Sequence, residues 1–112
     1  MIGRIHGRTA FERLARSGRS FRTGTLWCRF VNDPQASPLR VGFSVARSYG
    51  RAVERNRLRR RLRVIVAEAA PSHGLTAGWL LIGARPSAKE HTFDQLQAEV
   101  HRLLRRVESG PA

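Results

Sequence analysis

The residues best suited to chemistry lie between positions 50 and 63, in the segment GRAVERNRLRRRLR. Seven of these fourteen residues are arginine, and Glu54 is the only acid among them. The arginine side chain ends in a planar fork of donors that binds phosphate through paired hydrogen bonds, and its flat face stacks on bases. The segment therefore predicts a binding site for a polyanion, with nucleic acid as the leading class of partner.

The charge of the whole chain favours the same class of partner. The 112 residues carry a formal net charge of +13, with 20 arginines and one lysine, Lys89, against eight acids. A charge of this size promotes association with polyanions. The alternative, a solvated helix face that only aids solubility, fits surfaces of mixed sign better. If about six to ten phosphates are contacted, the affinity should fall by ~10³ or more between low and moderate salt.

Residues that could catalyse a reaction or hold a metal are sparse. Cys28 is the single cysteine, so it can form neither an internal disulfide nor a cysteine-based metal site, and the sequence leaves its role open. The four histidines lack the spacing of zinc ligands. A protein-only nuclease would need clustered carboxylates to hold its metal, whereas the eight acids include no adjacent pair. The sequence therefore predicts neither a catalytic residue nor a protein-bound metal.

The elements that must position the arginines fit one domain. A chain of 112 residues has room for one modest hydrophobic core. We expect a single domain over residues 1–112, with flexible termini at about 1–8 and 108–112. No segment approaches the ~20 apolar residues of a membrane span, and the amino-terminal segment has no apolar run of signal-peptide length. The expected location is the cytoplasm.

The first predicted element is a short helix over about 10–17. Thr9, followed three residues later by Glu12, matches a capping box, in which each side chain satisfies a backbone donor of the first turn. Phe11 and Leu14 then fall on the same side of the helix. We expect this side to be buried.

Two strands are predicted next, over about 26–31 and 39–45. In the first, Leu26, Cys28 and Phe30 alternate with Trp27, Arg29 and Val31. In the second, apolar side chains alternate with Arg40, Gly42 and Ser44. This period of two is typical of strands with one face in the core. Because only the turn NDPQASP separates the two runs, we expect them to form a hairpin.

The arginine-rich segment predicts an amphipathic helix over about 52–69. At roughly 100° per residue, its apolar residues gather on one stripe and its arginines spread around the remainder. The stripe consists of Leu58, Leu62, Ile65, Val66 and Ala69. A basic helix of this kind can also lie on a membrane surface, but burial of the stripe in a domain core is favoured.

The last third of the chain predicts a buried strand and a closing helix. The apolar run GWLLIGARP at 78–86 is bounded by glycine and proline, as is typical of a buried strand. After it, Thr92 and Gln95 match a second capping box. The apolar face of the closing helix is expected to consist of Phe93, Leu96, Val100, Leu103, Leu104 and Val107.

Asn56, between Arg55 and Arg57, carries the most specific resemblance. The stretch VGFSVARSYGRAVERNRLRRRLR resembles the signature of the protein subunit of bacterial ribonuclease P, whose hallmark is this Arg-Asn-Arg triplet. RVG at 40–42 and GARP at 83–86 also agree, so the resemblance covers nearly all of the chain. It implies an α+β fold, a two-layer α/β sandwich like domain 2 of ribosomal protein S5, with a four-stranded sheet, packed helices and a left-handed βαβ crossover. Pattern alone would favour the right-handed crossover.

The resemblance also implies a function. Members of this family are the small basic partner of a catalytic RNA that removes the 5′ leader from precursor tRNA, with Mg²⁺ held by the RNA. The implied partners are this RNA and precursor tRNA, with no membrane and no small-molecule substrate. The residues expected to contact the catalytic RNA are Arg51, Arg55, Asn56, Arg57, Arg59, Arg60 and Arg63. The alternative is a structural RNA-binding protein, such as a ribosomal component, with no part in catalysis.

A second surface is expected for the single-stranded leader. The resemblance implies a cleft between the sheet and the basic helix, with Phe11, Arg40, Ser44 and Arg47 at the matching positions. Single strands bind to aromatic stacking surfaces beside a track of cations. On this ground Trp27 and Arg29 join the set, although Phe11 and Trp27 would also suit a hydrophobic core.

Overall fold

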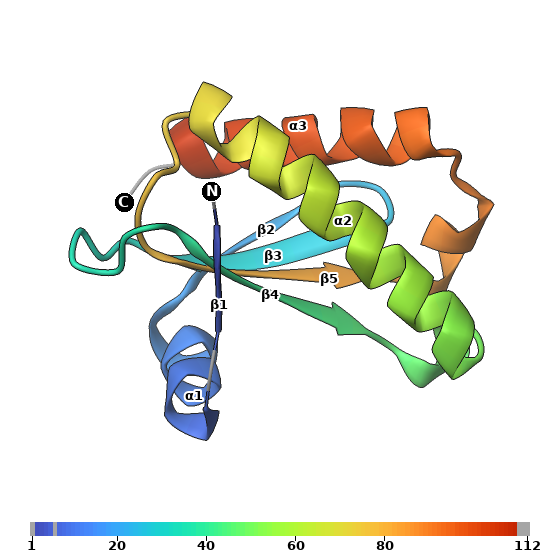
Figure 1. The fold of residues 1–112 in the computed structure, drawn as a ribbon, viewed down its shortest axis with the longest axis horizontal. Helices are drawn as coiled ribbons and strands as arrows, with labels where there is room; N and C mark the ends of the chain where they lie inside the picture. Colours follow the sequence, from blue (N-terminus) through green and yellow to red (C-terminus); the bar gives the residue numbers. More distant parts are fainter. Residues whose placement is uncertain (1, 6, 110–112) are drawn as a thin grey trace.

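The computed structural model describes residues 2–5 and 7–109, which form a mixed α/β domain (Figure 1). One sheet lies between two long helices on one side and a short helix on the other. The elements in chain order are β1 (Gly3–Arg4), α1 (Arg8–Ser17), β2 (Arg19–Arg22), β3 (Leu26–Val31), β4 (Arg40–Val45), the 3-10 turn η1 (Arg47–Tyr49), α2 (Ala52–Ser72), β5 (Trp79–Ala84), the 3-10 turn η2 (Pro86–Glu90) and α3 (Phe93–Ser109).

The strand order of the sheet is β1-β4-β5-β3-β2. β5 lies at the centre, parallel to β4 and antiparallel to β3. The predicted hairpin between β3 and β4 is therefore wrong, because each of these strands pairs with β5 instead of with the other. Alternation along a strand indicates which residues face the core, but it contains no information about the neighbouring strand. The hairpin in this part of the fold joins β2 and β3.

The sheet has five strands, whereas four were expected. The additional edge strand is β1, which pairs in parallel with β4 through Gly3 and Arg4. Two residues are too few for a period of two to be recognised in the sequence. β1 lies within the segment that was expected to be a flexible terminus. Of the two expected flexible termini, residues 1, 6 and 110–112 lie outside the described part of the chain.

The β4-α2-β5 connection crosses over the face of the sheet that also carries α3. In Figure 1 the sheet is seen from its β1 and β4 edge, with α2 above it and β5 behind β4. The chain runs along β4, returns above the sheet through α2 and then enters β5, so its path turns anticlockwise while it moves away from the viewer. The crossover is therefore left-handed, in agreement with the resemblance and against the general preference for right-handed crossovers.

The main core lies between the sheet and the pair α2 and α3. The predicted stripe of α2 is buried throughout, and so is the predicted face of α3 apart from Phe93, which is 40% exposed. Cys28 points into this core from β3 and is fully buried. Burial raises the pKa of its thiol to about 12, so the thiol stays neutral and behaves as a small apolar side chain.

Glu99 is a buried acid in α3 that ties this helix to the turn between β2 and β3. Its Oε2 accepts hydrogen bonds from Thr23 Oγ1, from the Thr25 backbone N–H and from the Leu26 backbone N–H, each at 2.7 Å. Its Oε1 accepts one from Thr25 Oγ1 at 2.8 Å and lies 3.0 Å from His91 Nε2. Burial by itself raises the pKa of Glu99, but these hydrogen bonds outweigh it and hold the pKa below its ordinary value.

The short helix α1 packs on the opposite face of the sheet. Leu14 forms a small second core there with Ile5 and Val31. Phe11 was expected beside Leu14, but it is 41% exposed, so this prediction is wrong. The capping box at Thr9 is also wrong, because the helix begins at Arg8, two residues before the predicted start, and Gly7 takes the cap position.

The capping box predicted for α3 is confirmed. Gln95 Oε1 accepts a hydrogen bond from the Thr92 backbone N–H at 2.8 Å, and Thr92 Oγ1 accepts one from the Gln95 N–H at 3.2 Å. These two bonds satisfy backbone donors of the first turn that have no partner inside the helix. They fix the start of the helix that carries Glu99.

Candidate nucleic-acid interface

The arginine-rich helix α2 begins with a carboxylate that holds its first turn. Glu54 Oε1 accepts a hydrogen bond from the Arg51 backbone N–H at 2.9 Å, and Glu54 Oε2 lies 2.9 Å from Lys89 Nζ. The backbone hydrogen bond, followed by the contact with Lys89, lowers the pKa of Glu54. The single acid of the basic segment therefore stabilises the helix start against the repulsion between neighbouring arginines.

The Arg-Asn-Arg triplet is divided between structural and exposed side chains. Arg55 is partly buried and donates from Nη1 to the Gly50 carbonyl oxygen at 2.8 Å, which fixes the chain just before the helix. Asn56 Oδ1 accepts a hydrogen bond from Arg59 Nη1 at 2.9 Å. Arg57 is exposed. Arg55 and Asn56 thus hold neighbouring groups in place, while Asn56 and Arg57 are both exposed to solvent.

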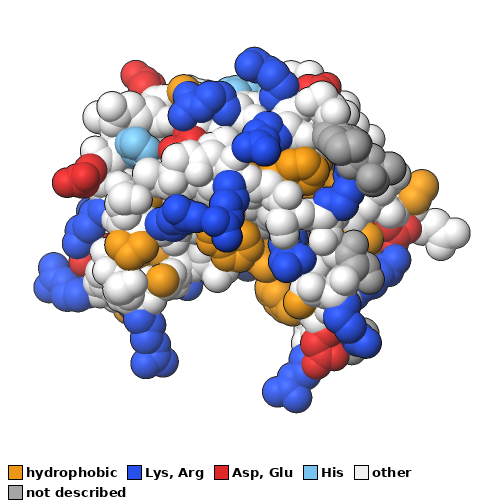
Figure 2. All heavy atoms as spheres, turned by 180° about the vertical axis from the view of Figure 1, so that it is seen from behind, with side chains coloured by type: hydrophobic (Ala, Val, Ile, Leu, Met, Phe, Trp, Pro, Cys, Tyr) orange, Lys and Arg blue, Asp and Glu red, His pale blue; other side chains and the backbone are white. Residues whose placement is uncertain are grey.

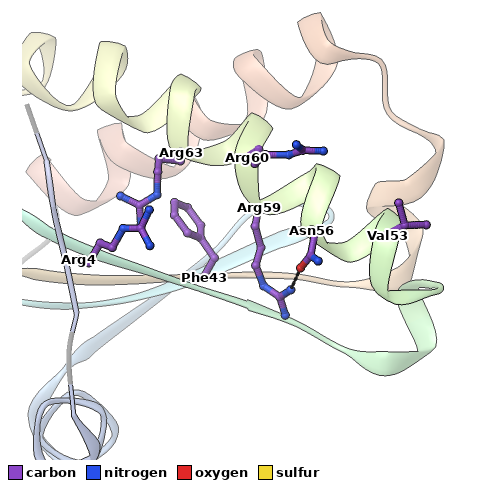
Figure 3. A pocket seen from close by; sticks show the side chains of 7 residues that line it. All are labelled: Arg4, Phe43, Val53, Asn56, Arg59, Arg60 and Arg63. Carbon is purple, nitrogen blue, oxygen red and sulfur yellow. Dashed lines mark hydrogen bonds between the residues drawn. The ribbon is translucent and has the colours of Figure 1, made fainter.

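A hollow of about 670 Å³ lies between α2 and the β1 and β4 edge of the sheet (Figure 3). We call it the α2 hollow. Four predicted RNA-contact residues, Asn56, Arg59, Arg60 and Arg63, line it from the helix. The remaining lining residues are Arg4, Phe43 and Val53. The arrangement surrounds one aromatic ring with four guanidinium groups.

Arg63 is held against the sheet at one end of the α2 hollow. Its Nη2 donates to the Val41 carbonyl oxygen at 3.4 Å, and its guanidinium lies over the Phe43 ring, 5.2 Å from the centroid. Burial, and to a lesser extent the charge of Arg4, lowers the pKa of Arg63. An arginine remains charged under these conditions, so the two guanidinium groups form a concentrated positive site.

Arg57, another predicted residue of α2, lies on a different side of the helix. It lines a hollow of about 190 Å³ together with Arg61, which was not predicted, and with Glu54 and Lys89. Arg51 precedes the helix and is exposed. The basic helix therefore presents cations on two sides, while its apolar stripe is buried.

Three of the residues predicted to bind the leader, Trp27, Arg29 and Ser44, lie on the face of the sheet opposite α2. The strand register places Trp27 beside Gly83 and Gly83 beside Ser44. In the same way, Arg29 shares this face with Leu81. The expected cleft between the sheet and α2 is therefore wrong for these residues, because the apolar stripe of α2 fills the space above the sheet.

Trp27 is the main aromatic surface on this open face. A Cβ placed on Gly83 would overlap its indole, so the ring lies directly over the glycine. A hollow of about 320 Å³ lies beside it, lined by Ser20, Phe21, Arg22, Trp27, Cys28, Arg29 and Arg85. The indole is half-buried rather than part of the core. An aromatic surface next to three arginines suits a single-stranded nucleic acid.

The other predicted leader residues are less closely grouped. Arg29 donates to the Gly18 carbonyl oxygen at 3.2 Å, and Arg40 lies over the Trp79 ring at 5.7 Å near α1. Phe11 on α1 and Arg47 in η1 are exposed, but neither lines one of the hollows described above. Trp27, Arg29 and Ser44 thus form the group that the structure brings together.

The molecule is hollowed on the side of the open sheet face. Figure 2 shows this concavity between the projecting part that carries α1 and the opposite end of the molecule, with arginine side chains on both flanks. A cation on either side of a groove draws a polyanion into it. The shape and the charge of this face therefore agree.

Sequence reasoning missed several basic and aromatic residues of the two surfaces. Arg4 belongs to β1, for which the sequence contains no periodic signal. Phe43 was expected to be a core residue, but it is only partly buried at the sheet edge. Arg22 lies at the end of β2 and Arg85 directly follows β5, and both line the hollow beside Trp27. Knowledge of the strand order was needed to find them.

The described residues form neither a helix that could cross a membrane nor a cluster of metal-binding side chains. Within residues 2–5 and 7–109, no helix has the length and apolar character that a membrane crossing requires. In the same part of the chain, no three His, Cys, Asp or Glu side chains come together in a way that could hold a metal ion.

The fold and the two basic surfaces define a small nucleic-acid-binding domain. Residues 3–108 match the family described as Ribonuclease P. The chain belongs to this family and is a protein component of ribonuclease P.

Individual relatives agree with this assignment. The chain is 39% identical to the ribonuclease P protein component of Chloroflexus aggregans over 93% of this chain and 76% of the relative. It is 38% identical to that of Roseiflexus castenholzii, over 87% and 79% of the two chains. The protein is thus similar to ribonuclease P protein components over most of its length.

Solved structures agree as well. A Staphylococcus aureus RNase P protein mutant, described as having defective mRNA degradation activity, superposes with a TM-score of 0.83 and 28% identity, over 94% of this chain and 87% of that one. The RNase P protein from Thermotoga maritima gives a TM-score of 0.81 over 92% and 96%; at 21% identity this likeness concerns the fold alone. The ribonuclease P fold is therefore established for this chain.

Proposed function

We propose that this subunit binds the catalytic RNA of ribonuclease P through α2 and the 5′ leader of precursor tRNA through the open face of the sheet. The RNA performs the cleavage, and the protein raises the affinity of the holoenzyme for substrates that carry a leader. The observation that carries the proposal is the separation of the two basic surfaces, which lie on opposite sides of one sheet.

The chemistry of each surface supports its proposed partner. Folded RNA presents a dense array of phosphates, and a rigid helix can align several arginines with it better than a loop can. A leader is single-stranded, so its bases are free to stack on Trp27 while Arg22, Arg29 and Arg85 contact its phosphates. This division also accounts for the presence of an aromatic residue on the open face.

Mg²⁺ is assigned to the RNA. Hydrolysis of a phosphodiester by metal ions requires oxygen ligands that hold the ions near the scissile phosphate, and the RNA supplies these ligands. The protein contributes positive charge near the substrate phosphates, which lowers the concentration of Mg²⁺ that the RNA needs. The expected site of action is the cytoplasm, where tRNA precursors are processed.

Reconstitution with the ribonuclease P RNA of the same organism tests the proposal. Precursor tRNA with a long leader and precursor tRNA with a one-nucleotide leader are cleaved by the RNA with and without protein, across a range of Mg²⁺ concentrations. We expect the protein to lower the Mg²⁺ requirement and to lower KM more for the long leader. An equal effect on both substrates would contradict leader binding, and no effect on either would contradict the proposed function.

Variants of the basic helix test the RNA contact. Arg57 is exposed, so Arg57→Ala should leave the melting temperature unchanged and weaken binding to the RNA. Loss of one phosphate contact should also reduce the slope of log K against log salt by about 0.9. Arg102→Ala, at an exposed position of α3, is the matched control. Arg55→Ala should weaken assembly as well, with a further loss from its bond to Gly50.

Cleavage of messenger RNA by the protein alone is the alternative activity to test, because one similar structure is described by its defect in mRNA degradation activity. Incubation of the protein alone with an unstructured mRNA tests this activity. We expect no cleavage, since hydrolysis is assigned to the catalytic RNA. Cleavage that copurifies with the wild-type protein would instead support an activity of the protein itself.

A further inference from the structure

The α2 hollow contains a feature that contact with RNA phosphates does not require. Phosphates call for cations, and exposed arginines on the outer side of α2 would suffice. This hollow also contains Phe43, whose aromatic ring stands between the sheet and the helix. A partly buried aromatic residue among arginines calls for a ligand with both a flat apolar face and a negative charge.

We propose that the α2 hollow binds one unpaired nucleotide of the catalytic RNA, with its base against Phe43 and its phosphate among the surrounding arginines. The inference rests on the proposed function, because it names the element of that RNA which the protein recognises. An A-form duplex keeps its bases stacked inside the helix, so a ring set back between a helix and a sheet can contact only a base that has left the stack.

The position of the ring supports this geometry. Figure 3 shows Arg4 and Arg63 on one side of Phe43, and Arg59, Asn56 and Val53 on the other. The Arg63 guanidinium lies 5.2 Å from the ring centroid and holds the ring upright. The other side of the ring faces the part of the hollow that Arg59 and Asn56 line.

The size and the polar groups of the hollow fit a nucleotide. Its volume is about 670 Å³, and pockets that hold small ligands span roughly 300–1,000 Å³. No acid occurs among the described residues that line it. Asn56 adds amide N–H donors at the rim, which can contact an acceptor on the edge of a base. Its Oδ1 meanwhile fixes Arg59. This arrangement gives the asparagine of the triplet a function that a third arginine could not supply.

Phe43→Leu removes the aromatic face but keeps an apolar side chain on β4. Phe93→Leu is the matched control, because Phe93 is an exposed phenylalanine outside the hollow. We expect Phe43→Leu to weaken binding to the ribonuclease P RNA about tenfold at every salt concentration, with an unchanged salt slope because no cation is lost. Phe93→Leu should bind like wild type, and both variants should remain folded by circular dichroism.

The outcomes separate this inference from the proposed function. If wild-type protein fails to bind the RNA, the proposed function itself fails. If wild type binds and Phe43→Leu binds equally well, the nucleotide pocket is wrong while RNA binding stands. A reduced salt slope in folded Phe43→Leu would also overturn the inference, since it would mean that the ring acts by positioning an arginine.

A second measurement needs no variant. Adenosine 5′-monophosphate and, separately, inorganic phosphate are titrated into isotope-labelled protein and followed by NMR. We expect the nucleotide to shift the ring signals of Phe43 and the side-chain amide signals of Asn56, and phosphate to leave the ring signals in place. Equal shifts with phosphate alone would reduce the hollow to an anion site and overturn the inference.

Discussion

Replacement of Glu99 by glutamine is predicted to destabilise the protein at neutral pH and to remove part of its sensitivity to acid. Glu99 is 1% exposed, and its Oε2 accepts three hydrogen bonds of 2.7 Å from the turn that leads into β3. Glutamine has the same shape and can place its carbonyl oxygen at the position of Oε2. The perturbation thus removes the negative charge and keeps the acceptor at the position of Oε2. At the position of Oε1 it places an amide NH2, to which the Thr25 hydroxyl can turn as an acceptor.

The magnitude follows from those three bonds. A hydrogen bond to a charged group contributes about 1.5–3 kcal/mol and a neutral one about 0.5–1.5 kcal/mol, so the change costs about 1 kcal/mol for each bond. The neutral side chain is cheaper to bury, which offsets part of this loss. We expect a net loss of about 2 kcal/mol. For a domain of this size it lowers the melting temperature by about 8 °C.

The assay is thermal unfolding of both proteins by circular dichroism between pH 7 and pH 3. The pKa of Glu99 is lowered from 4.5 in the fold, so its contribution is present above pH 4.5 and is lost as the pH falls through the lower folded value. The difference between wild type and Glu99→Gln should therefore close in acid. A difference that stays constant down to pH 3, or no difference at pH 7, would refute the reasoning.

Three further predictions concern the two surfaces and the core. Gly83→Ala should displace the Trp27 indole, which a red shift of tryptophan fluorescence detects, and should abolish the benefit of a long leader in reconstituted cleavage. Cys28, whose pKa is raised to about 12 by burial, should react with a thiol reagent at pH 8 only after unfolding; rapid reaction of the native protein would contradict its burial. Glu54→Gln should lower the melting temperature by less than Glu99→Gln does, because Glu54 is more exposed, and the effect should fade below the lowered pKa of Glu54.

The sequence predicted the faces of its elements better than their arrangement. Leu58 and Leu62 are separated by the spacing of a helix, and Trp27 and Arg29 by the spacing of a strand. Local geometry therefore shows which residues share a face of each element. Arg29 and Ser44 were correctly expected on polar strand faces even though the pairing of their strands was wrong. Alternation along a strand identifies the residues that share one face, whichever strand is the neighbour in the sheet.

The remaining features depend on contacts between distant parts of the chain. Glu99 occupies a position on α3 where an acid is normally exposed, and only the donors of Thr23, Thr25 and Leu26 make its burial possible. Phe11 has the correct spacing for the core, but the small second core around Leu14 does not extend to it. The α2 hollow was not foreseen because Arg4 reaches it from β1, which is far from α2 in the sequence.

The central position of β5 has a consequence for biosynthesis. β3 and β4 share no backbone hydrogen bonds, so a growing polypeptide that ends before residue 79 has only separate pieces of sheet. The apolar stripe of α2 then has no complete surface to cover, and its arginines are already present. During translation this protein is therefore cationic and has an incomplete sheet until residues 79–84 have been made, so its folding must follow the arrival of one late strand.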